Sequence, residues 1–220
     1  MNDTTRTPDG DVISIGNLKI GEKVLAIDRN DQIIPTEVIA ILHYENASEG
    51  TNSPTHKILL LKCSLLALFY TFTTDTGHKI SLTSEHLVYV GNQTYLQARH
   101  INSKEHQLFI AGEDGQLEPS NILSIDIQLK RGYATPITQH GTLLVNNVSS
   151  SCYASVFHHQ LGHVAMAPLR WIHRVKKLFG LVNKDESNEN GIHWYPRALN
   201  NIVHMFIPFP DIFTSTTGRI

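Results

Sequence analysis

Apolar and polar residues alternate in short runs along the first two thirds of the chain, with the period of two that is typical of β-strands. The clearest run is residues 80–90, where apolar positions lie on both sides of a polar group, Thr83 to His86. Turn sequences rich in Gly, Asn, Asp and Pro separate the runs. The other predicted strands are 12–15, the second half of 18–28, 33–42, 70–74, 108–111, 122–129 and 137–146. Short strands spaced in this way predict a compact all-β domain.

The polar group inside residues 80–90 is the first candidate site. A polar break in a buried strand costs free energy unless its groups are hydrogen-bonded. Thr83 and His86 therefore either bond each other and the nearby backbone, or face a site. The strand pattern by itself favours neither interpretation.

The pattern changes after Cys152. Residues 165–179 carry apolar side chains at helical spacing with basic residues between them, which predicts an amphipathic helix. Residues 183–190 are a polar linker, and residues 198–206 form a second apolar helical stretch. The change divides the chain into a predicted β domain, residues 1–160, and a helical C-terminal region, residues 161–220.

Composition narrows the class of protein. With 41% hydrophobic and 17% charged residues over 220 positions, the chain can bury one good core. A net charge of -2 argues against a nucleic-acid partner, because no basic excess neutralises phosphates. The two cysteines, Cys63 and Cys152, lack zinc-type spacing.

Two segments of the β domain are candidates for a secretory signal or a membrane span, and neither has the required pattern. The first seven residues are polar and lack the apolar core of a secretory signal. An apolar run at 59–70 is interrupted by Lys62 and Cys63, and it falls short of the roughly 20 residues that cross a bilayer. We interpret it as a buried or anomalous insertion.

Several motifs occur in an order that resembles the C-terminal autoprocessing region of hedgehog proteins, the Hint (hedgehog/intein) domain. The resemblance covers nearly the whole chain, and its ordered set of motifs is much more specific than the Thr-x-x-His step alone. The matching segments are 18–28, 37–39, 82–88, 136–146, 151–154, 167–170 and 190–195.

The resemblance implies a pseudo-symmetric all-β disc with a helical appendage that recognises a sterol. The family cleaves itself from an N-terminal signalling segment through a thioester and passes that segment to cholesterol, with no cofactor or metal. By resemblance His86 donates a proton to the leaving nitrogen and Thr83 orients the scissile amide. The parent protein would enter the secretory pathway and reach the cell exterior, and the C-terminal region, including Trp194 and Tyr195, would meet a sterol or a membrane.

Three departures from the family pattern bear on activity. The nucleophilic Cys-Phe pair of the family has no match here, and it would stand close to Met1, so the chain is expected to be truncated or inactive. His43 stands at the position of the acid that activates the sterol in the family; it either acts as a base there or is a partly exposed histidine at a strand end. Residues 53–68 have no counterpart, which suggests either a translated intron or a lineage-specific loop.

Two further residues match accessory positions of the family. Cys152 matches an accessory cysteine, although a small buried residue is the alternative role. His140 stands in a His-Gly-Thr step and either lines the site or packs as a hydrogen-bonded histidine.

Two other classes of function stay open. His159 and His163 lie four residues apart, which is ligand spacing for zinc on a helix, but the Glu of a His-Glu-x-x-His motif is missing. A structural role for both is the favoured alternative. The second class is a folded relic without enzymatic activity that binds a sterol or a protein partner.

Overall fold

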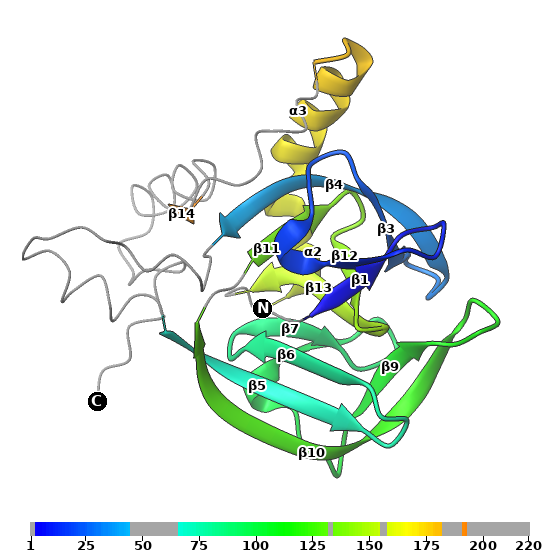
Figure 1. The fold of residues 1–220 in the computed structure, drawn as a ribbon, viewed down its shortest axis with the longest axis vertical. Helices are drawn as coiled ribbons and strands as arrows, with labels where there is room; N and C mark the ends of the chain where they lie inside the picture. The colour runs from blue at the N-terminus through cyan, green and yellow to red at the C-terminus, as the bar shows by residue number, and fades with distance from the viewer. Residues whose placement is uncertain (1–2, 45–65, 132–133, 155–157, 182–190, 193–220) are drawn as a thin grey trace, which may run out of the picture.

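The computed structural model describes residues 3–44, 66–131, 134–154, 158–181 and 191–192. Strands make up most of this part, and the helices follow them (Figure 1). The elements up to residue 100 are β1 (Thr4–Arg6), β2 (Val12–Ser14), the 3-10 helix η1 (Ile15–Asn17), β3 (Lys23–Ile27), β4 (Ile33–Tyr44), β5 (Leu66–Thr74), β6 (Lys79–Thr83), β7 (His86–Tyr89), β8 (Tyr95–Gln97) and η2 (Ala98–His100). The later elements are β9 (Gln107–Ala111), β10 (Leu117–Arg131), β11 (Ala134–Thr138), β12 (Thr142–Val145), β13 (Val148–Ala154), α2 (His159–Ala165), α3 (Ala167–Leu178) and β14 (Gly191–Ile192).

Two long strands, β4 and β10, organise the sheets. β10 pairs with β9 through residues 117–121 and with β5 from residue 122 onward, with a bulge where the partner changes. β4 pairs in the same manner, with β3 over residues 33–37 and with β11 beyond them. Both strands therefore change partners along their length, β4 also pairing with β14 at its end, and both curve around the centre of the molecule (Figure 1). This repeated arrangement confirms the predicted pseudo-symmetric β disc.

The core lies between the sheets, where alternate side chains of each strand point inward. Tyr89, Phe72, Leu18 and Ile27 are among its largest fully buried side chains. β7 lies between β13 and β8, and its Leu87, Val88 and Tyr89 are all buried. An interior strand covered on both faces reads as a continuous apolar run, which explains why 87–90 departs from strict alternation.

The two helices follow β13; α2 contacts β13, and α3 contacts β4 and projects away from the disc (Figure 1). α3 confirms the helix predicted at 165–179, with Pro168 in its first turn. Gly162 lets α2 approach β13 closely, since a Cβ there would lie 2.9 Å from Cγ of Tyr153. α2 begins at His159, so the predicted domain boundary between residues 160 and 161 falls inside a helix.

The predicted insertion needs a correction at its C-terminal end. Its last three residues, 66–68, form the start of β5 and pair with β10. Ala67 is buried while Leu68 is 40% exposed, as alternation in a strand requires. The rest of the insertion, the linker at 183–190 and the helix predicted at 198–206 lie outside the described residues. Among the described helices, none has the length and apolar character to cross a membrane.

Candidate functional site

His86 stands at the first position of β7, directly after a tight turn from β6. Its Nε2 donates a hydrogen bond to the carbonyl oxygen of Ser151 on the neighbouring strand β13, at 2.8 Å. Burial lowers the pKa of His86, and the contact with the Ser151 carbonyl offsets only part of this effect. The ring is therefore neutral at pH 7, with its proton on Nε2 and its Nδ1 able to accept another.

The turn before His86 is held by contacts to elements on both sides. The Ser84 nitrogen donates to the Leu68 carbonyl at 3.3 Å, and the Ser84 carbonyl accepts from Arg99 of η2 at 3.1 Å. Glu85 forms an ion pair with the Arg99 guanidinium and accepts a bond from Gln97. The polar groups of Ser84 and Glu85 thus find hydrogen-bond and ion-pair partners in neighbouring elements. These contacts hold the turn between β6 and β7 in place.

Thr83 ends β6 on the other side of this turn and is half-buried. It pairs with Phe69 of β5 in the sheet. The structure therefore brings Thr83 and His86 to the two ends of one turn, as the sequence predicts. His86 bonds to the Ser151 carbonyl and not to Thr83, so the two side chains do not satisfy each other.

The N-terminal strand β1 is anchored near the start of β6, the end of that strand opposite Thr83. Asn146 lies in the turn between β12 and β13 with φ of 50°, and its amide nitrogen donates to the Asp3 carboxylate and to the Lys79 carbonyl, each at 2.7 Å. Its side-chain oxygen accepts from the Thr4 nitrogen at 2.8 Å. One asparagine thereby anchors the start of the described chain to the first residue of β6.

Cys152 is next to Ser151 on β13, but its thiol points elsewhere. Its Sγ is 3.6 Å from Oγ1 of Thr138 on β11. Complete burial raises the pKa of the Cys152 thiol to about 11, so the thiol is protonated at neutral pH. The structure places Cys152 as an inert packing residue beside the site, which is the alternative role that its sequence allowed.

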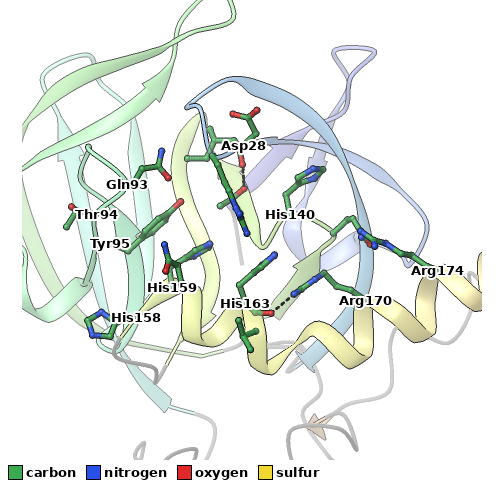
Figure 2. Close-up of a pocket in the computed structure, with 16 residues that line it drawn as sticks. Asp28, Gln93, Thr94, Tyr95, His140, His158, His159, His163, Arg170 and Arg174 are labelled. Atoms are coloured by element: carbon green, nitrogen blue, oxygen red, sulfur yellow. Dashed lines mark hydrogen bonds between the residues drawn. The ribbon is translucent and has the colours of Figure 1, made fainter.

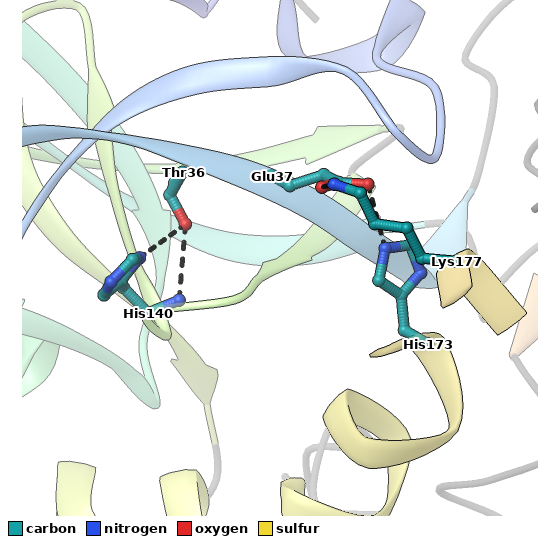
Figure 3. Close-up of polar contacts among 5 residues, drawn as sticks. All are labelled: Thr36, Glu37, His140, His173 and Lys177. Carbon is teal, nitrogen blue, oxygen red and sulfur yellow. Dashed lines mark hydrogen bonds and ion pairs between the residues drawn. The ribbon is translucent and has the colours of Figure 1, made fainter. Parts of the chain in front are cut away.

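His140 lies in the turn between β11 and β12, away from His86. Its Nδ1 is 2.8 Å from Oγ1 of Thr36 on β4 (Figure 3). Desolvation by its neighbours lowers the pKa of His140, with the Arg174 charge acting in the same sense and Asp28 opposing it. His43 belongs to β4 and pairs with Ile192 of β14 through the backbone; its side chain lies outside the described residues.

α3 is attached to β4 by a second polar cluster. The Glu37 carboxylate accepts from Nε2 of His173 at 2.9 Å and forms an ion pair with Lys177 (Figure 3). Burial alone would raise the pKa of Glu37, but the bonds from Lys177 and His173 outweigh it and leave the pKa lowered. This cluster attaches α3, which belongs to the predicted sterol-recognition region, to β4 of the disc.

Ser151 is the residue that sequence reasoning missed. Its carbonyl accepts from His86, and its hydroxyl lies 2.9 Å from Nδ1 of His159 on α2. Segment 151–154 predicts Cys152 as its accessory residue, whereas Ser151 makes the contacts with His86 and His159. The available signals were His159, four residues before His163, and the serine at position 151 of the matching segment.

The zinc alternative rests on His159 and His163. Their rings stack with centroids 6.1 Å apart, and each Nδ1 lies 2.9 Å from a hydroxyl, of Ser151 and Tyr153 respectively. Among the described residues, no group of three His, Cys, Asp or Glu side chains could hold a metal ion. The described contacts of this pair are hydrogen bonds and ring stacking, consistent with the favoured structural role.

The fold is a β disc in which a histidine begins a strand directly after a turn. A family model described as the Hint module matches residues 2–208, and the chain belongs to that family. Solved structures agree on the fold. A DnaB intein from Synechocystis matches with a TM-score of 0.53 and 13% identity, covering 70% of this chain and 96% of that chain. An intein-like domain from Clostridium thermocellum matches with a TM-score of 0.51 and 15% identity, covering 68% and 94%.

Curated relatives are hedgehog proteins. The chain is 30% identical to protein hedgehog of Drosophila ananassae over 210 residues, which covers 88% of this chain and 41% of that protein. It is 29% identical to the Tiggy-winkle hedgehog protein of Danio rerio over 212 residues, covering 92% and 45%. The chain therefore spans less than half the length of these relatives. The resemblance seen in the sequence is confirmed.

Proposed function

We propose that this Hint domain serves in a hedgehog-type precursor that cleaves itself ahead of the domain and passes its N-terminal signalling segment to a sterol. The observation that supports this most directly is the position of His86. The ring is held by the Ser151 carbonyl at 2.8 Å, and it stands across one turn from Thr83. A histidine oriented through one nitrogen leaves the other for proton transfer.

The chemistry would run through Nδ1 of His86. A cysteine of the precursor loses its thiol proton to Nδ1, and the thiolate attacks the carbonyl carbon of the preceding residue. The C–N bond breaks, a thioester C–S bond forms, and Nδ1–H gives its proton to the departing nitrogen. The lowered pKa of His86 makes its protonated form a better acid, which favours this last transfer. Thr83 would orient the scissile amide.

The sterol step would then involve the C-terminal region. A sterol hydroxyl attacks the thioester carbonyl, loses its proton to a base, for which His43 is the candidate, and releases the thiol. The outer face of α3 suits an apolar ligand, because Trp171 is 69% exposed and Leu178 is 81% exposed. Passage of the parent protein through the secretory pathway and membrane association of this region belong to the same proposal.

A fusion protein tests the cleavage. A reporter joined to the chain through a Cys-Phe pair, in a short series of linker lengths, should release the reporter on addition of dithiothreitol, which captures a thioester. His86→Ala should slow release by about 100-fold or more, since positioned proton transfer contributes that much. His100→Ala, which alters an exposed histidine of η2, is the matched control. Equal release from His86→Ala and the control would refute the assignment of His86.

Binding without cleavage is the second candidate function. It is favoured by the exposed apolar side chains of α3, Trp171 and Leu178, which present a binding surface whether or not the chain cleaves. A fusion that is never cleaved at any linker length, but binds a fluorescent sterol in a saturable manner, would support this function over the first.

A further inference from the structure

A pocket of about 880 Å³ lies on the far side of Ser151 from His86. It is bounded by α2, α3, the β8 strand and the turn between β11 and β12 (Figure 2). His159 and His163 approach it from one side and His140 from the other. The volume falls within the range of small-molecule sites. The function proposed above makes no use of this pocket.

Its charged side chains are strongly unequal in sign. Arg29, Arg170 and Arg174 line the pocket against a single carboxylate, Asp28. That carboxylate is committed to its own turn, because it accepts from the backbone nitrogens of Asn30 at 2.8 Å and of residue 32 at 3.0 Å. Within the part of the chain that the structure describes, none of the three arginines forms an ion pair with a carboxylate.

Of the three arginine charges, that of Arg170 costs the most free energy to bury. Its side chain is only 8% exposed, and it donates to the Tyr153 hydroxyl at 3.2 Å and to the His163 carbonyl. Both partners are neutral. Among the described residues no carboxylate pairs with this buried guanidinium, and a bound anion would neutralise its charge.

The three histidines add further donors. Each has its Nδ1 next to a hydroxyl: His140 to Thr36 at 2.8 Å, His159 to Ser151 at 2.9 Å and His163 to Tyr153 at 2.9 Å. Each hydroxyl also accepts from a nitrogen: from the His140 backbone, the Tyr153 backbone and the Arg170 side chain respectively. The hydroxyl hydrogen therefore has Nδ1 as its acceptor, and we assign the ring proton to Nε2 in all three. Their remaining ring nitrogens are then donors.

The lowered pKa values of the two α2 histidines are those of buried groups near positive charge, surroundings that would stabilise an anion. Burial lowers the pKa of both His159 and His163 to about 4, and nearby positive charges add to the effect. The groups that face the pair are each other, Arg29, Arg170, His140, Tyr95 and Tyr153. None of these is a carboxylate. An anion placed among them would raise both pKa values, so binding would take up protons.

We propose that this pocket binds a phosphoryl group, held by Arg29, Arg170 and Arg174. Arginine forks match phosphate oxygens, and donors arriving from several elements suit a tetrahedral dianion better than a flat carboxylate. The volume leaves room for more than one phosphate, so the ligand class is a phosphorylated organic molecule. Its source is either a soluble phosphate ester or a lipid headgroup.

Calorimetric titration of the purified chain with inorganic phosphate and pyrophosphate, at constant ionic strength set by sodium chloride, tests the proposal. Arg29→Gln and Arg174→Gln alter exposed side chains and should fold normally. Each should weaken saturable binding by about tenfold or more, the effect of one charged hydrogen bond. Arg6→Gln removes the same charge from exposed β1, outside the pocket, and should leave binding unchanged.

Two further measurements distinguish a lipid headgroup from a soluble phosphate ester and test the protonation of the histidines on binding. Stronger binding to vesicles containing phosphatidic acid, lost in Arg29→Gln, identifies a lipid headgroup, and binding of soluble phosphates alone identifies a soluble ester. Affinity for sulfate, which stays a dianion in mildly acidic buffer, should rise as pH falls. The absence of saturable binding, equal weakening by Arg6→Gln, or a sulfate affinity independent of pH would overturn the proposal. These readouts measure binding, so they are independent of whether the chain cleaves.

Discussion

The Tyr153 hydroxyl joins the two helices to the β disc, and replacing Tyr153 with Phe isolates its contribution. The hydroxyl accepts from Nη1 of Arg170 on α3 at 3.2 Å and lies 2.9 Å from Nδ1 of His163 on α2. Tyr153 is 3% exposed, so water cannot replace these bonds. Phe keeps the ring and its packing, and only the two hydrogen bonds are lost.

The expected cost follows from what stays buried. Leaving a buried donor or acceptor without its partner costs about 1–3 kcal/mol, with charged groups at the upper end. Arg170 loses one of its two neutral partners, while removal of the hydroxyl relieves its own desolvation. We expect Tyr153→Phe to lower the free energy of unfolding by about 2 kcal/mol, and the melting temperature by about 4–8 °C for a chain of this size.

Thermal unfolding followed by circular dichroism measures the effect, with Tyr70→Phe as the matched control. Tyr70 is half-buried, and its hydroxyl makes no hydrogen bond among the described residues. Amide hydrogen exchange should also speed up in α2 and α3 but not in β5. A melting temperature of Tyr153→Phe equal to that of Tyr70→Phe would refute the reasoning.

Two other changes probe the same region. Gly141 has φ of 78°, and a Cβ there would lie 2.5 Å from the Tyr153 hydroxyl, so Gly141→Ala should cost more than about 2 kcal/mol in urea unfolding. Gly77→Ala, with φ of 84° and nothing within 4 Å, carries the conformational cost alone, and an equal loss in both would contradict the steric argument. Glu37→Gln should lower stability at neutral pH by about 1 kcal/mol, a modest value because Lys177 is 59% exposed. The pKa of Glu37 lies below its ordinary 4.5, so the difference in stability between Glu37→Gln and wild type should persist above pH 4.5. It should disappear as pH falls through the lowered pKa. A difference unchanged in acid would exclude the ion pair as its source.

The strands around Thr83 and His86 were predictable because their cause is local. Apolar side chains at every second position must face the core, and this requirement can be read in the chain itself. The reason for the polar break between them was not local. Its groups are satisfied by Leu68 and Arg99, which only the folded sheet brings to the turn.

The helix at 165–179 shows a different limit. Its position was predictable from periodicity and from Pro168, and α3 occupies it. The side of the helix that faces the disc was not predictable, because the structure buries Arg170 and His173 while Trp171 stays exposed. Glu37 on β4 provides the partner that draws His173 inward, and no pattern within the helix records that carboxylate.

The sequence by itself determined the all-β class and the strands that flank Thr83 and His86, because alternation and turn residues are properties of neighbours along the chain. The family and the disc followed from the resemblance that the ordered motifs carry. The tertiary structure decided which groups meet. Ser151 lies between His86 and His159, the thiol of Cys152 faces Thr138, and the arginines gather at one pocket. Burial, hydrogen-bond satisfaction and charge balance depend on neighbours in space, and these set the protonation and the chemistry of each site.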